Sequence, residues 1–136
     1  MADAINTRHS MSPEISSWLT EELRWPVMAT LKSDGMPSLS VIWFDLADEP
    51  GTILLNTRRG RFKEHHLRRD PRLSLCFEDK NDYVTLEGRA ELIDDDDRGL
   101  ADIQALARRY DSDPGEFEGQ HRITILMRVE RVIRHR

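Results

Sequence analysis

The stretch that decides the fold is residues 54–71, LLNTRRGRFKEHHLRRDP. An apolar strand ends there at Asn56 and Thr57, a cationic turn with one glycine follows, and a short helical segment leads to Asp70 and Pro71. Backbone N–H groups at a helix N-terminus favour negative charge, and nearby arginine and lysine side chains add charge-assisted hydrogen bonds. This order of strand, donor-rich turn and helix predicts an anion-binding site.

The distribution of charge points to a small ligand. The 136-residue chain has 20 Lys+Arg against 25 Asp+Glu, a net charge of −5, which argues against extensive binding of nucleic acid or anionic membranes. Seven Lys and Arg residues nevertheless crowd into positions 58–72, while ten of the 25 acidic residues lie between Glu91 and Glu118. A local cationic site on an acidic protein suits a small anionic ligand.

Length and cysteine content limit the class of protein. The chain is long enough for one domain with a real core, but small for an enzyme that encloses a cofactor alone, so a site shared between two copies is expected. Cys76 is the only cysteine, which excludes an intrachain disulfide and favours a reducing compartment. Without a long apolar run or signal-peptide pattern, we expect a cytoplasmic protein that does not enter membranes.

The pattern of the chain predicts a mainly β fold with short helices. Residues 1–11 are expected to be a loose leader, and Ser12-Pro13-Glu14 to start a helix with Ile15, Trp18, Leu19 and Leu23 on its apolar face. Asp34-Gly35 predicts a hairpin turn, and Gly88 a bulge or a close backbone approach. A third helix, over 94–110 and after the short one in the cationic stretch, carries an apolar stripe. Period-two patterns predict strands over 27–32, 38–46, 52–57, 72–77, 83–93 and 123–129.

These elements predict a single domain over 1–136, built as a six-stranded antiparallel β-barrel with Greek-key-like connections. Both faces of the strand over 38–46 are expected to be at least half buried. Cys76 lies between apolar residues and is expected in the core.

The cationic turn offers the clearest chemistry. Arg61 and Lys63 can both reach the space above Asn56 and Thr57, and the Thr57 hydroxyl with local backbone donors would complete a phosphate site. The alternative is a solvated charge cluster on the surface, which we prefer for most of Arg58, Arg59, Arg68 and Arg69.

Three segments together carry a resemblance to a known family: ATLKSDGMPSLSVIWFDL, GTILLNTRRGRFKEHHLRRDPRLSL and YVTLEGRAEL, within residues 26–92. The chain resembles the pyridoxamine 5'-phosphate oxidase-like split-barrel flavoproteins, and most closely their branch that uses the deazaflavin coenzyme F420. The resemblance implies a homodimer of split β-barrels, with two cofactors in grooves at the subunit interface.

The resemblance also implies which residues bind the cofactor. The strand containing Ser40, Val41, Ile42 and Trp43 would lie along the tricyclic ring, although Trp43 could equally pack in the core. Asn56 and Thr57 match the pair near the phosphate, and Arg61 and Lys63 match the basic residues that bind it. Arg58 and Arg59 would suit the longer anionic tail of F420. One departure is His65-His66, where many relatives carry Arg-Asn.

The function implied is an F420-dependent oxidoreductase that passes hydride between the reduced cofactor and a small unsaturated organic substrate. An FMN-dependent oxidoreductase of the same fold and a non-catalytic cofactor-binding or carrier protein are the alternatives. Nucleic-acid binding is the weakest, because Phe62 is the only aromatic residue in the basic run. We expect no metal site, because adjacent His65 and His66 point to different sides of a helix, at the surface or dimer interface. We assign no catalytic residue, and expect the substrate to be set by residues 111–120 and the partner subunit.

Overall fold

A computed structural model describes residues 5–8 and 11–135. The strands are β1 (Ile5–Arg8), β2 (Val27–Leu31), β3 (Pro37–Val41), β4 (Asp45–Leu46), β5 (Thr52–Arg58), β6 (Arg72–Asp79), β7 (Asp82–Ile93) and β8 (Arg122–His135). The helices are α1 (Pro13–Thr20), α2 (Phe62–Arg69), α3 (Asp96–Arg109) and the short 3-10 helix η2 (Pro114–Phe117). The predicted class, mainly β with short helices and antiparallel pairing, is confirmed.

The predicted number of strands is wrong, because the described residues form eight. β1 lies in the expected leader and pairs antiparallel with the end of β8; residues 1–4 and 9–10 of that leader lie outside the described part. The second difference is that the strand expected over 38–46 is divided into β3 and β4. β3 pairs with β2, whereas β4 pairs with β5.

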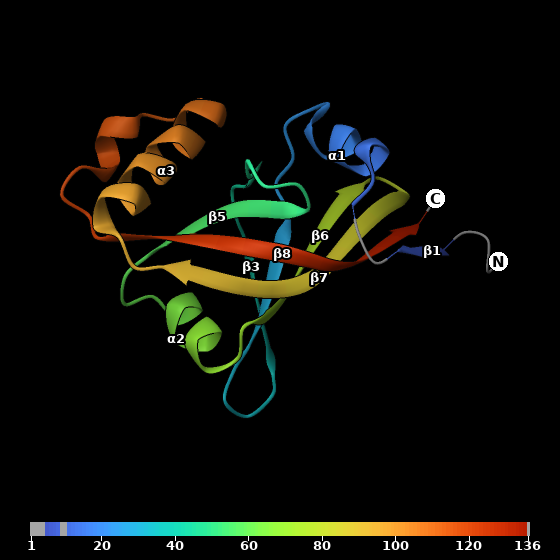
Figure 1. Cartoon of the computed structure of the whole chain (residues 1–136), viewed down its shortest axis with the longest axis horizontal. Coiled ribbons are helices and arrows are strands. Elements are labelled where there is room, and N and C mark those ends of the chain that lie inside the picture. The colour runs from blue at the N-terminus through green and yellow to red at the C-terminus, as the bar shows by residue number, and fades with distance from the viewer. Residues whose placement is uncertain (1–4, 9–10, 136) are drawn as a thin grey trace.

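This division explains how the sheet curls. The strand order is β3-β2-β6-β7-β8-β5-β4, so β3 and β4 are at opposite edges, although only residues 42–44 separate them in sequence. Four Cα–Cα steps of about 3.8 Å hold Val41 and Asp45 within about 15 Å of each other. The two edges must therefore approach across a seam that residues 42–44 span. Figure 1 shows the curled sheet, with α3 and α1 near opposite ends and α2 below β7.

The hairpin between β2 and β3 is as predicted, because Gly35 supplies a φ of +87° and Asp34 Oδ1 accepts a hydrogen bond from the Met36 N–H. Its outer face differs from expectation. Leu39 and Val41 are 66% and 63% exposed, so the expectation that both faces would be half buried is wrong. No element of the described chain covers that side of this edge hairpin.

Two glycines allow β7 and α3 to approach β8 closely. A Cβ on Gly88 would lie 2.0 Å from the Arg128 carbonyl oxygen, and the β7–β8 register shifts between Glu87 and Gly88, which confirms the predicted bulge and close approach. A Cβ on Gly99 would lie 1.9 Å from the Arg122 carbonyl oxygen. Gly99 therefore lets α3 rest directly on the start of β8.

Helix α1 begins as predicted, because Ser12 Oγ accepts a hydrogen bond from the Ile15 N–H at 3.2 Å. Ile15 and Leu19 are buried against the core, but the helix ends at Thr20, so Leu23 lies beyond it and is 37% exposed. Cys76 also differs from expectation: its neighbours Leu75 and Phe77 are buried, and period-two alternation places Cys76, which is half-buried, on the other face of β6.

Candidate functional site

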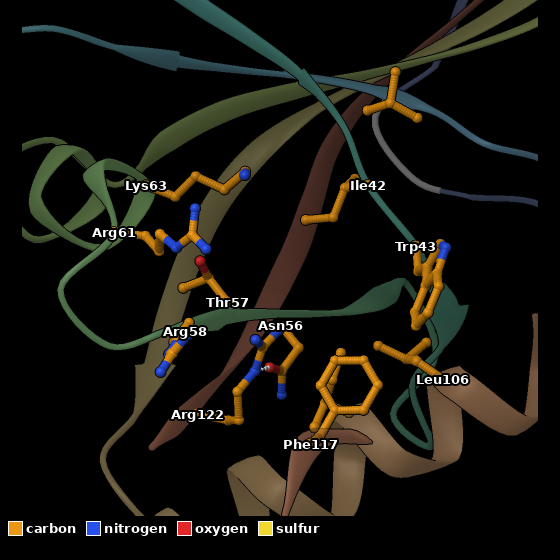
Figure 2. A pocket seen from close by; sticks show the side chains of 12 residues that line it. Ile42, Trp43, Asn56, Thr57, Arg58, Arg61, Lys63, Leu106, Phe117 and Arg122 are labelled. Atoms are coloured by element: carbon orange, nitrogen blue, oxygen red, sulfur yellow. Dashed lines mark hydrogen bonds between the residues drawn. The ribbon is translucent and has the colours of Figure 1, made fainter. Parts of the chain in front are cut away.

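A cleft of about 290 Å³ opens beside the seam of the sheet. The segment linking β3 to β4 forms one side, the end of β5 and the turn after it form a second, and α3 with the loop that follows forms a third (Figure 2). The cleft therefore exists because three segments that are distant in sequence meet where the sheet is not closed.

Eight of the nine residues predicted for cofactor binding line this cleft: Val41, Ile42, Trp43, Asn56, Thr57, Arg58, Arg61 and Lys63. Ser40 does not line it; it pairs with Met28 within the β2–β3 hairpin. The structure thus brings the two predicted groups, the 41–43 segment and the cationic turn, into one cavity. Whether they contact a cofactor stays a prediction.

Four lining residues were not predicted: Ile103, Leu106, Phe117 and Arg122. Ile103 and Leu106 belong to the apolar face of α3, and Phe117 belongs to the loop expected to influence the substrate. Arg122 could have been found only from the pairing of β5 with β8, which places it directly opposite Arg58.

The floor of the cleft is polar and largely fixed by internal hydrogen bonds. Asn56 and Thr57 are buried at the end of β5. The Asn56 side-chain amide donates to the Gly99 carbonyl at 2.9 Å, and its Oδ1 accepts from Arg122 Nε at 3.0 Å. The Thr57 hydroxyl has no hydrogen-bond partner within residues 5–8 and 11–135, so it is available to a ligand.

The cleft carries a cationic end formed by Arg58, Arg61, Lys63 and Arg122, which we call the cleft cations. Within the described part of the chain, none of them forms an ion pair with a carboxylate, and no aspartate or glutamate lines the cleft. Burial, and then the charges of Arg61 and Arg122, lower the pKa of Lys63. Burial, followed by the charges of Arg58 and Arg61, lowers the pKa of Arg122 to about 10.

The neighbouring arginines are neutralised. Arg59 pairs with Asp94 at 3.2 Å and Asp96 at 2.9 Å, and Arg68 pairs with Glu64 at 2.9 Å and Asp94 at 2.7 Å. We call these five residues the arginine–carboxylate network. The expected contact of Arg59 with an anionic tail is therefore not supported, because two carboxylates already occupy its guanidinium.

The N-terminus of α2 is a weaker anion site than expected. Arg61 occupies the N-cap position and its side chain makes no capping hydrogen bond. Glu64, however, accepts a hydrogen bond from the Gly60 N–H at 2.8 Å, and this bond is the main cause of the lowered pKa of its carboxyl. The Glu64 carboxylate therefore offsets part of the positive helix dipole at this terminus. Side chains rather than backbone groups supply most of the positive charge at the cationic end of the cleft.

The side of the cleft away from Arg61 and Lys63 is aromatic and apolar (Figure 2). Trp43 stacks on Tyr110, with ring centroids 5.2 Å apart and planes at 11°, and Phe117 meets Trp43 edge-on at 6.1 Å. The Tyr110 hydroxyl donates to the Arg24 carbonyl at 2.5 Å and accepts from the Phe44 N–H at 3.2 Å. Trp43 is half-buried, and it both packs against the core and lines the cleft. An aromatic wall thus lies across the cleft from Arg61 and Lys63.

The two adjacent histidines lie outside this cleft. His66 Nδ1 is 2.9 Å from Thr30 Oγ1, a contact that connects α2 to β2, while His65 is exposed. His66 is therefore half-buried by contacts within this chain. Across residues 5–8 and 11–135, no three histidine, cysteine or acidic side chains are grouped as metal ligands. Nor does this part contain a helix that is long and apolar enough to span a membrane.

An antiparallel sheet that curls around an open seam, with a cationic and aromatic cleft at the seam, defines a split-barrel protein. The model of the pyridoxamine 5'-phosphate oxidase family matches residues 11–135, and the chain belongs to this family.

Solved structures share the fold. An F420 reductase superposes with a TM-score of 0.74 at 23% identity, over 89% of this chain and 98% of the other. The conserved hypothetical protein Rv2991 from Mycobacterium tuberculosis gives 0.75 at 26% identity, over 91% and 84%. General Stress Protein 26 from Bacillus anthracis gives 0.66 at 19% identity, over 88% and 89%.

Proposed function

We propose that this protein is an F420-dependent oxidoreductase, which transfers hydride between the deazaflavin and a small unsaturated organic substrate. The observation that carries the proposal is the polarity of the cleft. Its cationic end, with Arg61, Lys63 and the free Thr57 hydroxyl, suits a phosphate. Its aromatic and apolar end, with Trp43 and Phe117, suits a planar ring.

The residues present fit the coenzyme, because the donors are cationic, unpaired with carboxylates and adjacent to an apolar wall. The coenzyme would supply the hydride-carrying carbon, since none of the lining side chains is a nucleophile activated by a base. The cleft cations would bind the anionic part of the coenzyme. Trp43, Leu106 and Phe117 would orient the ring and exclude water. We assign no proton donor.

F420 is favoured over FMN by the surplus of positive charge. Arg61 and Lys63 alone match one phosphate, whereas Arg58 and Arg122 are further unpaired cations in the same cleft. The longer anionic tail of F420 would use them. The family binds flavins, and an F420 reductase shares this fold across nearly its whole length. FMN is the second candidate, in a pyridoxamine-phosphate-oxidase-like reaction, and a non-catalytic carrier is the third.

We propose further that the protein works as a homodimer. A cleft of about 290 Å³ lies at the lower limit for sites that bury drug-sized ligands, so one subunit alone does not enclose a tricyclic coenzyme. Val41 lines the cleft and is 63% exposed. Beside it Leu39, Val27 and Met36 are exposed apolar residues of the β2–β3 hairpin. A second subunit covering this hairpin would complete the site.

The cofactor site is tested by titrating the protein with F420 and following the coenzyme fluorescence. Replacing Arg61 and Lys63 by alanine removes two charge-assisted hydrogen bonds, each of about 1.5–3 kcal/mol, so affinity should fall by at least a hundredfold. The matched control is the double alanine variant of Arg59 and Arg68, which removes two nearby charges held by carboxylates. Undiminished binding in the first variant would refute the site assignment.

The same preparation separates the alternatives. Protein purified with a yellow FMN chromophore, which F420 does not displace, would favour the FMN enzyme. Tight F420 binding with no reduction or oxidation of the coenzyme across a panel of enones, nitroaromatics and quinones would favour a carrier.

The dimer is tested by light scattering coupled to gel filtration. Leu39→Glu places a charge on the exposed face of β3 and should give a monomer that binds F420 at least tenfold more weakly. Ala101→Glu adds the same charge on the exposed side of α3 and should leave a dimer. A wild-type monomer that binds F420 tightly would exclude a shared site.

A further inference from the structure

Arg122 occupies an unfavourable position for a surface cation. In the β5–β8 pairing it lies directly opposite Arg58, and like charges at directly opposed positions destabilise an antiparallel pair. The chain has 25 acidic residues, yet none of those in the described part of the chain lines the cleft that both arginines share. The repulsion is therefore not relieved within the described part of the protein.

Neutral groups hold Arg122 in place. Its Nε donates to Asn56 Oδ1 at 3.0 Å, its Nη1 donates to Gln120 Oε1 at 3.0 Å, and its guanidinium carbon lies 5.3 Å from the centre of the Phe117 ring. The third nitrogen, Nη2, has no hydrogen-bond partner within residues 5–8 and 11–135. The guanidinium is thus half-buried and fixed, but it keeps its full charge and one free donor for the cleft.

The cleft cations form two pairs. Arg61 is the neighbour of Lys63 in the turn after β5, and Arg58 is the cross-strand neighbour of Arg122. After burial, which is the largest cause, the charge of Arg61 lowers the pKa of Lys63 most and the charge of Arg58 lowers the pKa of Arg122 most. Figure 2 shows Arg61 and Lys63 on one side of Thr57 and Arg58 and Arg122 on the other, with Arg122 beside Asn56. Two cationic pairs separated by a free hydroxyl suit two anionic groups rather than one.

We propose that the cleft is a divided anion site, in which Arg61 and Lys63 bind one anionic group and Arg122 with Arg58 binds a second. Arg122 is then a specificity-determining residue that selects ligands with two adjacent anionic groups over ligands with one. The shared chemistry is a phosphate joined to a second phosphate or to a carboxylate. The inference rests on the proposed cofactor site and adds the charge class of its ligand.

Calorimetric titrations with inorganic phosphate and diphosphate, at constant ionic strength, test this directly. Wild-type protein should bind diphosphate at least tenfold more tightly. Arg122→Gln should remove most of this preference and change phosphate affinity by less than about threefold. Lys63→Gln should weaken both ions. Arg59→Gln, outside the cleft, is the charge-matched control and should change neither.

Arg58→Gln keeps the test decisive if Arg122→Gln does not fold, because the Arg58 side chain is exposed and donates no hydrogen bond within the described residues. Arg58→Gln should also remove the preference. Arg122→Lys, which keeps the charge, should restore part of it. Phosphoglycolate, titrated in parallel, identifies whether a carboxylate or a phosphate is the better second group, and tighter binding of either two-group probe than of phosphate supports the proposal.

Three results would overturn the inference: no preference of the wild-type protein for diphosphate or phosphoglycolate over phosphate, no binding of any of the three ions, or equal losses for phosphate and the preferred two-group probe in Arg122→Gln. These inorganic probes report only on the cations, so the outcome is separate from that of the F420 titration. F420 binding without a preference for either two-group probe would remove this inference alone. A preference without binding of F420 or FMN would remove the proposed function alone.

Discussion

Arg58 and Arg59 are adjacent in sequence but have opposite surroundings. Arg59 meets two carboxylates, Asp94 and Asp96, in the segment that leads into α3. Arg58 ends β5 and lines the cleft opposite another arginine. Composition alone would describe both as members of one basic run. The difference shows that the fold neutralises part of that run for structural use and leaves the cleft cations unpaired, which is the arrangement expected of an anion site.

Gly99→Ala should have the largest effect, because it should disturb both the cleft and the arginine–carboxylate network. The added Cβ would lie 1.9 Å from the Arg122 carbonyl oxygen, and α3 would have to move away from β8. Asn56 would lose the Gly99 carbonyl that positions it, and the network would lose its geometry. We expect the free energy of unfolding to fall by about 3 kcal/mol or more, measured by urea denaturation.

Gly115→Ala is the matched control, because a Cβ there would meet only the flexible Asp113 side chain at 3.2 Å. In an exposed helix, replacing glycine by alanine stabilises by up to about 1 kcal/mol. A stabilised Gly99→Ala variant would therefore show that α3 does not rest on β8 as described.

Changes in pH should have the next largest effect, and they should distinguish the cleft cations from the arginine–carboxylate network. Burial lowers the pKa of Arg122 to about 10, and it also lowers the pKa of Lys63. A bound anion favours the protonated cations, so anion affinity is complete below these values and is lost as pH rises through about 10. Sulfate, whose charge is constant, should bind about tenfold more weakly at pH about 11 than at pH about 8.

The stability that the arginine–carboxylate network contributes should change at low pH instead. The pKa values of Glu64, Asp94 and Asp96 are lowered by hydrogen bonds, chiefly from Gly60, Arg68 and Arg59 respectively. Their contribution to stability is present above the ordinary values of 3.8–4.5 and is lost as pH falls through the lowered values.

Sulfate affinity that stays constant up to pH about 11 would contradict the description of the cleft cations.

Local patterns predicted much of the fold and part of the site. The Asp34-Gly35 turn, the Ser12 cap and the Gly88 bulge follow from the conformations that these residues favour. The 38–46 strand was predicted as continuous, because its apolar residues alternate through Trp43. The break at residues 42–44 is a tertiary effect: the chain must cross from one edge of the sheet to the other, and local period-two patterning does not record such a crossing.

The same limit applies to the cleft. Asn56, Thr57, Arg61 and Lys63 lie close together in sequence, so their grouping could be predicted. Arg122 is 59 positions beyond Lys63, and only the register of β5 with β8 brings it to Arg58. The pairing of Arg59 with Asp94 and Asp96 likewise depends on where α3 begins in space. Sequence spacing therefore located the cations but not which of them are neutralised.

The smallest and most specific prediction concerns the sign of a stability change. Arg58→Gln removes one of two opposed cations and should raise the free energy of unfolding by a few tenths of a kcal/mol in chloride buffer without phosphate. Arg68→Gln removes a partner of Glu64 and Asp94 and should lower it by about 0.2–1 kcal/mol, the range for exposed ion pairs. Saturating diphosphate should reverse the first sign, because the wild-type protein then gains more from the ligand than the variant does. Equal signs for the two variants in ligand-free buffer would show that Arg58 and Arg68 share one kind of environment, and the distinction between cleft and network would fail.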